Sequence, residues 1–531
     1  MDTENRAEVT RAAGLVMAAI LVSRILGFVR ERAIAEVFGR TAATDAFFAA
    51  FALPDLMYQL LVGGALSSAF IPVFTQYLAR DQEKEAWYVA SIFLNATFLI
   101  LLGIMILGVV FAPVLAPFVG VGFTGEHRDL LILLMRLTFP AVFFTALAGL
   151  CMGVLHSYQI FLRPALGPII YNLAQILGAY LLGPLMGIMA MAVGTVAGAV
   201  GNFGVQFPEV LRRARRHYQR VVDFRHPGIR RMLELMLPAI LGLSIAQINV
   251  IISQNLASTL EEGSIVALRL ANRLINFPLG IFAMGISTAV FPTLAMLEAK
   301  GERQEFIRAL AFGLRIVFFI TIPSAAGMAA LRLPIVRLLF ESGEFTAADS
   351  AVTAYALLFY VPGLFAQAAL QVTTRGFYSL QDTKTPVKIG LFTVLVNLGL
   401  SLVFLRWTSL GAGGLALAFS LSSLVNVALA FAVLGRRLPG LLNWELASTV
   451  LKSTGASLIM AVSAAWTASF LEARWPLAGK LGQGVHTLGA IAAGVLVYLL
   501  LAAVLRMDEI RLVGSMLARR LKGRKRDGQE G

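Results

Sequence analysis

Charged residues are scarce in this chain of 531 residues, since they make up 14% of the sequence whereas hydrophobic residues make up 58%. A soluble protein carries roughly a quarter charged residues. The mean hydropathy is +0.79, and apolar residues occur along the whole length. This composition excludes a soluble domain with a single anchor and predicts a polytopic membrane protein.

Sequence signals for catalysis or cofactor binding are also missing. The only cysteine is Cys151, which excludes an internal disulfide, and the five histidines are not spaced as metal ligands. The sequence has neither a Walker A loop nor an HExxH zinc motif. We therefore expect no metal, no cofactor and no ATP hydrolysis within the chain.

The net charge of +14 could indicate nucleic-acid binding. The basic residues, however, lie mainly in short loops and near the C-terminus, as the positive-inside rule expects of a membrane protein. We therefore expect no nucleic-acid partner. The first apolar stretch follows Arg6 and Arg11 like a signal peptide, but it is too long and has no convincing cleavage site, so an uncleaved helix is expected.

Fourteen apolar stretches are long enough to cross a bilayer, which takes about 20 residues of helix. They cover roughly residues 12–36, 43–76, 88–117, 129–155, 161–182, 185–207, 232–257, 265–297, 306–329, 350–375, 386–405, 411–434, 447–470 and 484–505. The predicted fold is an all-α integral membrane protein with 14 transmembrane helices: two six-helix lobes related by a parallel repeat, plus two extra C-terminal helices.

The loop charges predict that both termini are cytoplasmic, because that side would hold about four times as many basic residues as the outer loops. The expected organisation is an N-lobe (1–207), a basic cytoplasmic linker (208–231), a C-lobe (232–440), spans 13 and 14 (441–506) and a basic cytoplasmic tail (507–531). The last two spans could line a groove for a lipid tail, or could serve packing or oligomerisation.

The two groups of six spans resemble each other in sequence. GALSSAFIPVF at 64–74 is similar to MGISTAVFPTL at 284–294, and HSYQIFLRP at 156–164 is similar to YSLQDTKTP at 378–386. The alternative is chance similarity between helices rich in small residues. Because six is an even number, both halves would enter the membrane from the same side, which makes the repeat parallel. Transporters of this kind rock two bundles around a site between them.

Four arginines interrupt apolar runs: Arg24, Arg30, Arg269 and Arg273. A charge at the centre of a spanning helix costs about 2.5–3.5 kcal/mol, and such charges usually face an internal cavity on a substrate path. Guanidinium groups bind phosphate oxygens bidentately. We predict that these residues bind an anionic substrate, with Arg24, Arg30 and Arg273 clamping a diphosphate.

Two carboxylates complete the predicted substrate-binding set. Asp45 opens the second span and could receive an arginine or act as an outer gate; alternatively, Thr44 or Asp45 is the helix N-cap of that same span. Glu31 belongs to the set as well, although it could instead pair with Arg30 while that arginine reaches a membrane interface. Helix-breaking residues predict bending elements for alternating access. These predicted hinge residues are Pro54, Gly63, Gly64, Pro278 and Gly280.

Several segments together resemble one transporter family. SRILGFVRERAIAEVFG, TDAFFAAFALPDL, GGALSSAFIPVF, ANRLINFPLGIF and GFYSLQDTKTPV are similar to the MurJ (MviN) lipid II flippases, which belong to a superfamily with the MATE multidrug exporters. The resemblance implies a two-lobed bundle around a cationic cavity. By that resemblance Arg24, Arg30, Asp45 and Arg273 match positions important for function, and Glu31 stands where an aspartate is usual.

The chain departs from this family at several positions. Tyr58 and Gln59 replace an arginine pair of many relatives, and Gly63 replaces an acidic residue, so the cavity should be less cationic. Ser253 and Ser401 stand where some relatives carry carboxylates for sodium, so sodium coupling is not expected here. The inside-negative membrane potential favours outward movement of an anionic head by about 2.3 kcal/mol per charge per 100 mV, and is the expected driving force.

The expected function is therefore that of a flippase, not an enzyme. It would move lipid II, the undecaprenyl-diphosphate-linked peptidoglycan precursor, from the inner to the outer leaflet of the bacterial cytoplasmic membrane. The alternatives are another polyprenyl-linked glycan or a MATE-like small-molecule cargo. A membrane transferase or phosphatase would need a carboxylate, histidine or serine constellation, which the sequence does not show. Expected partners are the lipid-linked substrate and membrane lipids, with the peptidoglycan-synthesis machinery as a further candidate.

Overall fold

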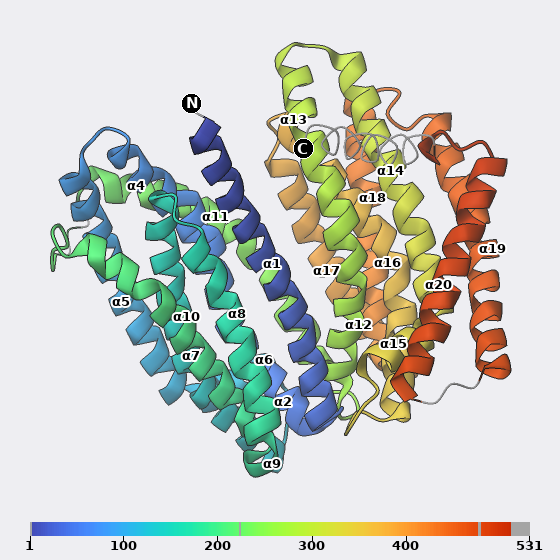
Figure 1. Ribbon diagram of the computed structural model, residues 1–531, viewed down its shortest axis with the longest axis horizontal. Helices are drawn as coiled ribbons and strands as arrows, with labels where there is room; N and C mark the ends of the chain where they lie inside the picture. Colours follow the sequence, from blue (N-terminus) through green and yellow to red (C-terminus); the bar gives the residue numbers. More distant parts are fainter. Residues whose placement is uncertain (1–2, 222, 224, 476–478, 511–531) are drawn as a thin grey trace. The chain divides into compact units, whose positions relative to one another are not determined.

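The computed structural model describes residues 3–221, 223, 225–475 and 479–510, which form helices joined by short connections (Figure 1). In this described part of the chain, the one β-type contact is an isolated bridge between Ser342 and Phe345. A lipid phase offers the backbone no hydrogen-bond partner, so helices that pair every amide internally are the favoured solution. The predicted all-α membrane fold is confirmed. Most of the predicted basic tail lies outside the described residues.

The chain forms two compact units, each with its own packing. Unit 1 comprises residues 1–266 and 342–346, and unit 2 comprises residues 267–341 and 347–531. The helix α11 (Pro227–Ala257) lies in unit 1, where it packs against the π-helix η1 (Leu60–Phe70). The lobe boundaries expected from the sequence stay predictions.

The remaining helices of unit 1 follow the chain in order. They are α1 (Thr3–Phe38), α2 (Ala42–Ala50), α3 (Ala52–Gln59), α4 (Ile71–Leu78), α5 (Glu83–Val110), α6 (Ala112–Val119), α7 (Gly125–Ser157), α8 (Leu162–Leu177), η2 (Gly178–Leu182), α9 (Gly183–Met186) and α10 (Met189–Ala214). The longest of them, α1, carries the stretch in which the sequence placed its first span. Thr41 begins α2 by accepting a hydrogen bond from the backbone N–H of Thr44.

Unit 2 holds most of α12 and all later helices. They are α12 (Ser264–Pro278), η3 (Leu279–Ala283), α13 (Met284–Ala299), α14 (Arg303–Ala330), α15 (Arg332–Phe340), α16 (Ala347–Ser379), α17 (Lys384–Trp407), α18 (Ala412–Arg437), α19 (Trp444–Arg474) and α20 (Gly479–Val504). Asn443 begins α19 by accepting from the backbone N–H of Leu446.

Eleven described helices or helix runs are long and apolar enough to cross a membrane, and each coincides with a predicted span. The other three predicted spans coincide with α1, with the run from α2 to α4, and with α11. The chain is therefore a multi-pass membrane protein, and the count of fourteen is consistent with the helices.

Helix lengths repeat between the two halves of the chain. The helices α5 and α14 each have 28 residues, α7 and α16 each have 33, and α10 and α18 each have 26. Equal lengths in the same order are what a duplicated six-span unit would leave. The helices α19 and α20 follow after the second copy, as the sequence predicted for the two extra spans.

Backbone conformation repeats as well. Residues with positive φ occur in five pairs, 218 to 224 residues apart: Gly39 with Gly263, Asp81 with Gly301, Gly125 with Gly343, Gln159 with Gln381, and Gly187 with Gly411. A positive φ is uncommon for residues other than glycine, yet both members of one pair are glutamine. These glutamines also align in the sequence echo around 156–164 and 378–386. Chance similarity does not account for such a series, so the internal repeat is supported.

The helix breaks lie where prolines and glycines interrupt the apolar runs. Gly63 and Gly64 lie within the π-helix η1, Pro278 ends α12, and Gly280 lies within the π-helical turn η3. Pro54 lies in the first turn of α3, directly after the break at Phe51. Prolines and π-helical turns are the usual causes of sharp helix kinks. Their role as hinges stays a prediction.

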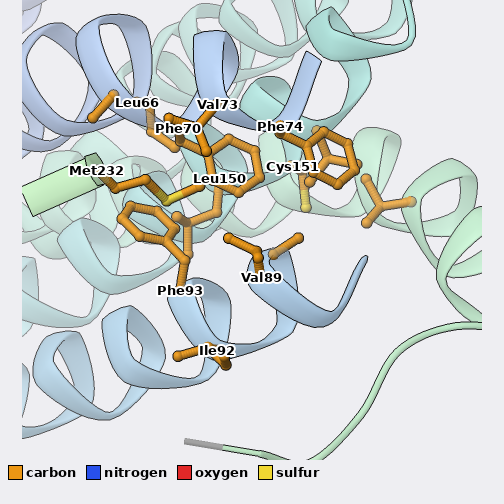
Figure 2. Close-up of a cluster of buried hydrophobic side chains, with 14 of the residues drawn as sticks. Leu66, Phe70, Val73, Phe74, Val89, Ile92, Phe93, Leu150, Cys151 and Met232 are labelled. Carbon is orange, nitrogen blue, oxygen red and sulfur yellow. The ribbon is translucent and has the colours of Figure 1, made fainter. Parts of the chain in front are cut away.

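The core of unit 1 gathers apolar side chains from η1, α4, α5 and α7, with several aromatic rings among them (Figure 2). The rings of Phe74 and Trp87 meet edge to face, with centroids 5.7 Å apart. Trp87 is fully buried, and its indole N–H donates to the hydroxyl of Tyr158 at 2.8 Å. Edge-to-face pairs add about 0.5–1.5 kcal/mol to the stabilisation from burial. This core packs the second predicted span against its neighbours despite its helix breaks.

The basic linker is attached to unit 1. The amide of Asn95 on α5 donates to the carbonyls of Gln219 and Val221 at 3.0 Å, and its oxygen accepts from the hydroxyl of Tyr218 at 2.6 Å. The backbone N–H of Gln219 donates to the hydroxyl of Ser91. These bonds hold the middle of the linker along α5.

One arginine ties the last two helices to unit 2. Arg315 on α14 contacts Glu509 at 2.7 Å, Glu445 on α19 at 3.0 Å and Asp508 at 3.4 Å. Glu509 also accepts from the hydroxyl of Thr449 at 2.9 Å. Because Glu509 is buried, removal of Arg315 would leave a buried charge without its main partner. The segment that contains α19 and α20 is therefore attached to α14 by ion pairs as well as by packing.

Candidate functional site

The candidate site in unit 1 is centred on Arg30 of α1. One terminal nitrogen of its guanidinium donates to Glu31 at 2.6 Å, and the other donates to the amide oxygen of Asn172 on α8 at 3.1 Å. The Arg30 side chain is 17% exposed and that of Glu31 is 2% exposed. The ion pair that the sequence offered as an alternative is therefore formed. It lowers the cost of holding a charge in an apolar surrounding.

Asn172 connects this arginine to two helices. Its amide nitrogen donates to the carbonyl of Pro168 at 2.8 Å on its own helix and to the carbonyl of Ser23 on α1 at 3.3 Å. With both carbonyls on the nitrogen side, the amide oxygen must face Arg30, which settles the orientation of the amide. Asn172 thus holds the guanidinium plane in one place relative to α1 and α8.

Further polar groups surround this pair. Asp55 of α3 and Tyr171 of α8 lie close enough to Arg30 for electrostatic interaction, and Tyr58 lies near Asp55. The buried Nε atom of Arg30 has no hydrogen-bond partner in the described part of the chain. An arginine with an unused N–H donor, held among acceptors and phenols, can donate a hydrogen bond to an anionic oxygen. Tyr58, one of the two residues that replace the family's arginine pair, thus lies beside this polar cluster.

The other predicted arginines are exposed within their own units. Arg24 lies in unit 1 on a stretch of α1 where apolar side chains are also exposed. Arg269 and Arg273 lie in unit 2, four residues apart, and therefore share one face of α12. A clamp that combines Arg24, Arg30 and Arg273 stays a prediction, as does a substrate contact of Arg269.

Asp45 has a defined local role. Its two carboxylate oxygens accept from the backbone N–H groups of Gly263 at 2.7 Å and Val266 at 2.8 Å, at the beginning of α12. The first N–H groups of a helix have no partner within the helix, and a carboxylate there also interacts favourably with the helix dipole. Asp45 caps this helix start across 218 residues of sequence. The expectation that Thr44 or Asp45 is the N-cap of the second span is wrong, because Thr41 is the N-cap of α2. Its predicted part in substrate binding is untested.

Sequence reasoning did not single out Asn172 or Tyr171. Both occur in LRPALGPIIYNLAQIL, where Tyr171, Asn172 and Gln175 are polar residues at one-turn spacing in an apolar run. That spacing predicts a polar stripe on one helix face, and it is the signal that could have found them. Their contact with Arg30, by contrast, depends on how α1 and α8 pack.

The fold defines a class of protein, the multi-pass helical transporters. The inward-facing conformation of a multidrug resistance MATE family transporter of the MOP superfamily matches with a TM-score of 0.66 over 81% of this chain and 98% of that chain. Its sequence identity is 15%, so the likeness concerns the fold alone. A solved lipid II flippase MurJ in an inward closed conformation matches with a TM-score of 0.78 and 28% identity, over 93% of this chain and 99% of that chain.

The chain belongs to the MurJ family of lipid II flippases. The family model described as lipid II flippase MurJ matches residues 34–481. A probable lipid II flippase MurJ of Vibrio cholerae is 32% identical over 94% of this chain and 96% of its own length. The lipid II flippase MurJ of Burkholderia cenocepacia is 31% identical over 84% and 88%, respectively. Members of this family are transporters and not enzymes, and their match confirms the predicted family and class.

Proposed function

We propose that this chain moves lipid II from the inner to the outer leaflet of the bacterial cytoplasmic membrane by alternating access. The observation that carries the proposal is similarity over nearly the whole chain to lipid II flippases, in sequence and in fold. Flipping requires no bond of the substrate to be made or broken. The protein needs only to bind the head group, shield it from the apolar phase and release it on the other side.

Arg30 is the proposed anchor for the diphosphate of the head group. Its guanidinium is already oriented by Glu31 and Asn172, so little rotamer freedom is lost when an anion binds. The proposed substrate-binding set is completed by Glu31, Asp45, Arg24, Arg269 and Arg273. The membrane potential supplies the driving force, at about 2.3 kcal/mol per charge per 100 mV, and we expect no coupled sodium ion.

The test of this function is complementation in a bacterium depleted of its own lipid II flippase. Expression of the chain should restore growth and the amount of lipid II that an externally added lipid II-cleaving enzyme can reach. The protein level in the membrane is measured in parallel. Normal membrane levels with neither growth nor accessible lipid II would contradict the proposal and favour another polyprenyl-linked cargo. Association of the chain with proteins of peptidoglycan synthesis is a separate proposal, and it can be examined in the same cells.

The orientation of the chain is a separate prediction, with both termini in the cytoplasm. Cysteines introduced by Arg216→Cys and Glu126→Cys replace exposed residues in the linker and in the first turn of α7, which is predicted to lie on the outer side, whereas the native Cys151 is buried. In sealed cells, a membrane-impermeant maleimide should label the protein with Glu126→Cys and spare the one with Arg216→Cys. Both should react after the cells are opened. The reverse pattern in sealed cells would invert the topology.

A further inference from the structure

A cluster of arginines surrounds one buried carboxylate at the end of α10. Glu209 is contacted by Arg163 from the beginning of α8 at 3.3 Å, by Arg212 at 3.1 Å and by Arg213 at 3.4 Å. One carboxylate balances one of these three positive charges. The cluster therefore keeps a net charge of about +2 in a small volume, held in place by a side chain that is itself buried.

Neighbouring groups hold Arg213 in the cluster. Its guanidinium lies over the ring of Tyr158, 4.5 Å from the ring centre, in a cation–π arrangement. The hydroxyl of Tyr158 donates to Glu83 at 2.8 Å. Burial, together with this bond, raises the pKa of Tyr158 to about 12, so the ring stays neutral at physiological pH. The side chains of Arg212 and Arg163 are 69% and 37% exposed. Arg213 is 35% exposed, but its guanidinium is held between Glu209 and the Tyr158 ring. Arg163 and Arg212 are therefore the two arginines that are not held against a ring.

Exposed apolar residues continue directly from the cluster. Phe207 and Leu211 of α10 and Arg215, its C-cap, are exposed and lie at successive four-residue steps, so they form one row that changes from apolar to basic. Phe161 and Leu162 are exposed beside Arg163 at the beginning of α8. The span that contains α10 ends at Ala214. This surface therefore resembles the end of a membrane-spanning segment, with exposed apolar side chains on one side and guanidinium groups on the other.

We propose that Arg163 and Arg212 form a binding site for the phosphodiester head group of an anionic phospholipid, whose acyl chains lie against Phe207, Leu211, Phe161 and Leu162. Two forked guanidinium groups from different helices suit a phosphate, which accepts several charge-assisted hydrogen bonds. The site would bind a lipid of the bulk membrane rather than the transported substrate. Nothing in this proposal depends on the function proposed above, because its test measures lipid binding and not transport.

The chain offers a matched control cluster. Arg230 and Arg231 at the beginning of α11 contact Glu234 at 3.5 Å and 3.4 Å, and the three side chains are more than half exposed. They carry the same type of charge near the linker, but they come from a single helix and share an exposed carboxylate. If only general attraction to an anionic surface operated, removal of either arginine pair would have the same effect.

The experiment measures binding of phosphatidylglycerol to the purified full-length protein in neutral detergent by native mass spectrometry, with phosphatidylcholine as the neutral lipid. Arg163→Ala/Arg212→Ala should weaken phosphatidylglycerol binding on the order of 25-fold, since each arginine near a membrane surface contributes about fivefold. Arg230→Ala/Arg231→Ala should change it less than about twofold. Arg213 still pairs with Glu209 in the first variant, so folding is expected to persist, and the unfolding temperature in detergent checks it.

Equal losses in both double variants would overturn the proposal and leave only a general charge effect. Unchanged binding in a folded Arg163→Ala/Arg212→Ala protein would overturn it as well. Displacement of phosphatidylglycerol by soluble glycerol phosphate at similar concentration would show a plain anion site and would exclude the lipid. If the first variant does not fold, Arg212→Gln alone serves, because Arg212 is the most exposed of the three arginines, and about a fivefold loss is then expected.

Discussion

Replacement of Arg30 by alanine is expected to lower lipid II translocation by at least about a hundredfold, because two charge-assisted contacts to the diphosphate, each worth about 1.5–3 kcal/mol, would be lost. Arg30→Lys should restore only part of the activity, since an ammonium cannot donate to two oxygens in the geometry of a guanidinium. The measurement is the outer-leaflet lipid II in the complementation assay, normalised to the amount of protein in the membrane.

The structure shows why Arg30→Ala must be compared with a second variant. Arg30→Ala leaves Glu31 buried without its 2.6 Å partner, and breaking a buried ion pair on one side costs about 3–5 kcal/mol. The double variant Arg30→Ala/Glu31→Ala removes both charges and should insert normally. Arg32→Ala is the matched control, because Arg32 is two residues away, half-exposed, and 3.8 Å from Glu36. Full transport by the double variant at normal membrane levels would remove Arg30 from the substrate site.

Loss of the Asp45 carboxylate is expected to destabilise unit 1 by about 3 kcal/mol or more, because two charge-assisted hydrogen bonds to backbone N–H groups at a helix start are lost. Asp45→Ala should therefore lower the unfolding temperature in detergent and the amount of protein in the membrane. Asp45→Asn keeps one acceptor and should have a smaller effect. Asp129→Ala replaces an exposed aspartate in the first helical turns of α7 and serves as the control.

This series also separates the two roles considered for Asp45. A capping role predicts that transport falls only in proportion to the amount of folded protein. If Asp45→Asn unfolds at the temperature of the unaltered protein but no longer transports lipid II, the carboxylate acts on the substrate or on a gate. In that case the essential role of Asp45 is not the pair of hydrogen bonds to Gly263 and Val266.

The sequence predicted the helices well because membrane insertion depends on local hydropathy, which a linear scan measures. It also predicted Arg30 as a residue of interest, since a charge in an apolar run is unusual on any reading. It could not predict Asn172 as the partner of Arg30, because 142 residues separate them and only the packing of α8 on α1 brings them together. The cap formed by Asp45 has the same origin.

The position of α11 shows a further limit. Lipid tails are as apolar as leucine, so the hydrophobic pattern of a spanning helix does not say which neighbour it packs against. By sequence α11 opens the second repeat, yet its contacts place it in unit 1. Helix lengths and positive-φ residues reveal the duplication, whereas the choice of partner depends on side-chain shape across the whole bundle.

Residues 342–346 also belong to unit 1, and the backbone N–H of Glu344 donates to the carbonyl of Glu36 at 2.8 Å. During synthesis the ribosome therefore finishes most of α12 to α15 before it delivers the last piece of the first unit. At about 5–20 residues per second, the delay between residues 266 and 346 is roughly 4–16 s. For that time the carbonyl of Glu36 at the end of α1 lacks its final partner, which gives insertion factors and chaperones a defined interval in which to act on the nascent chain.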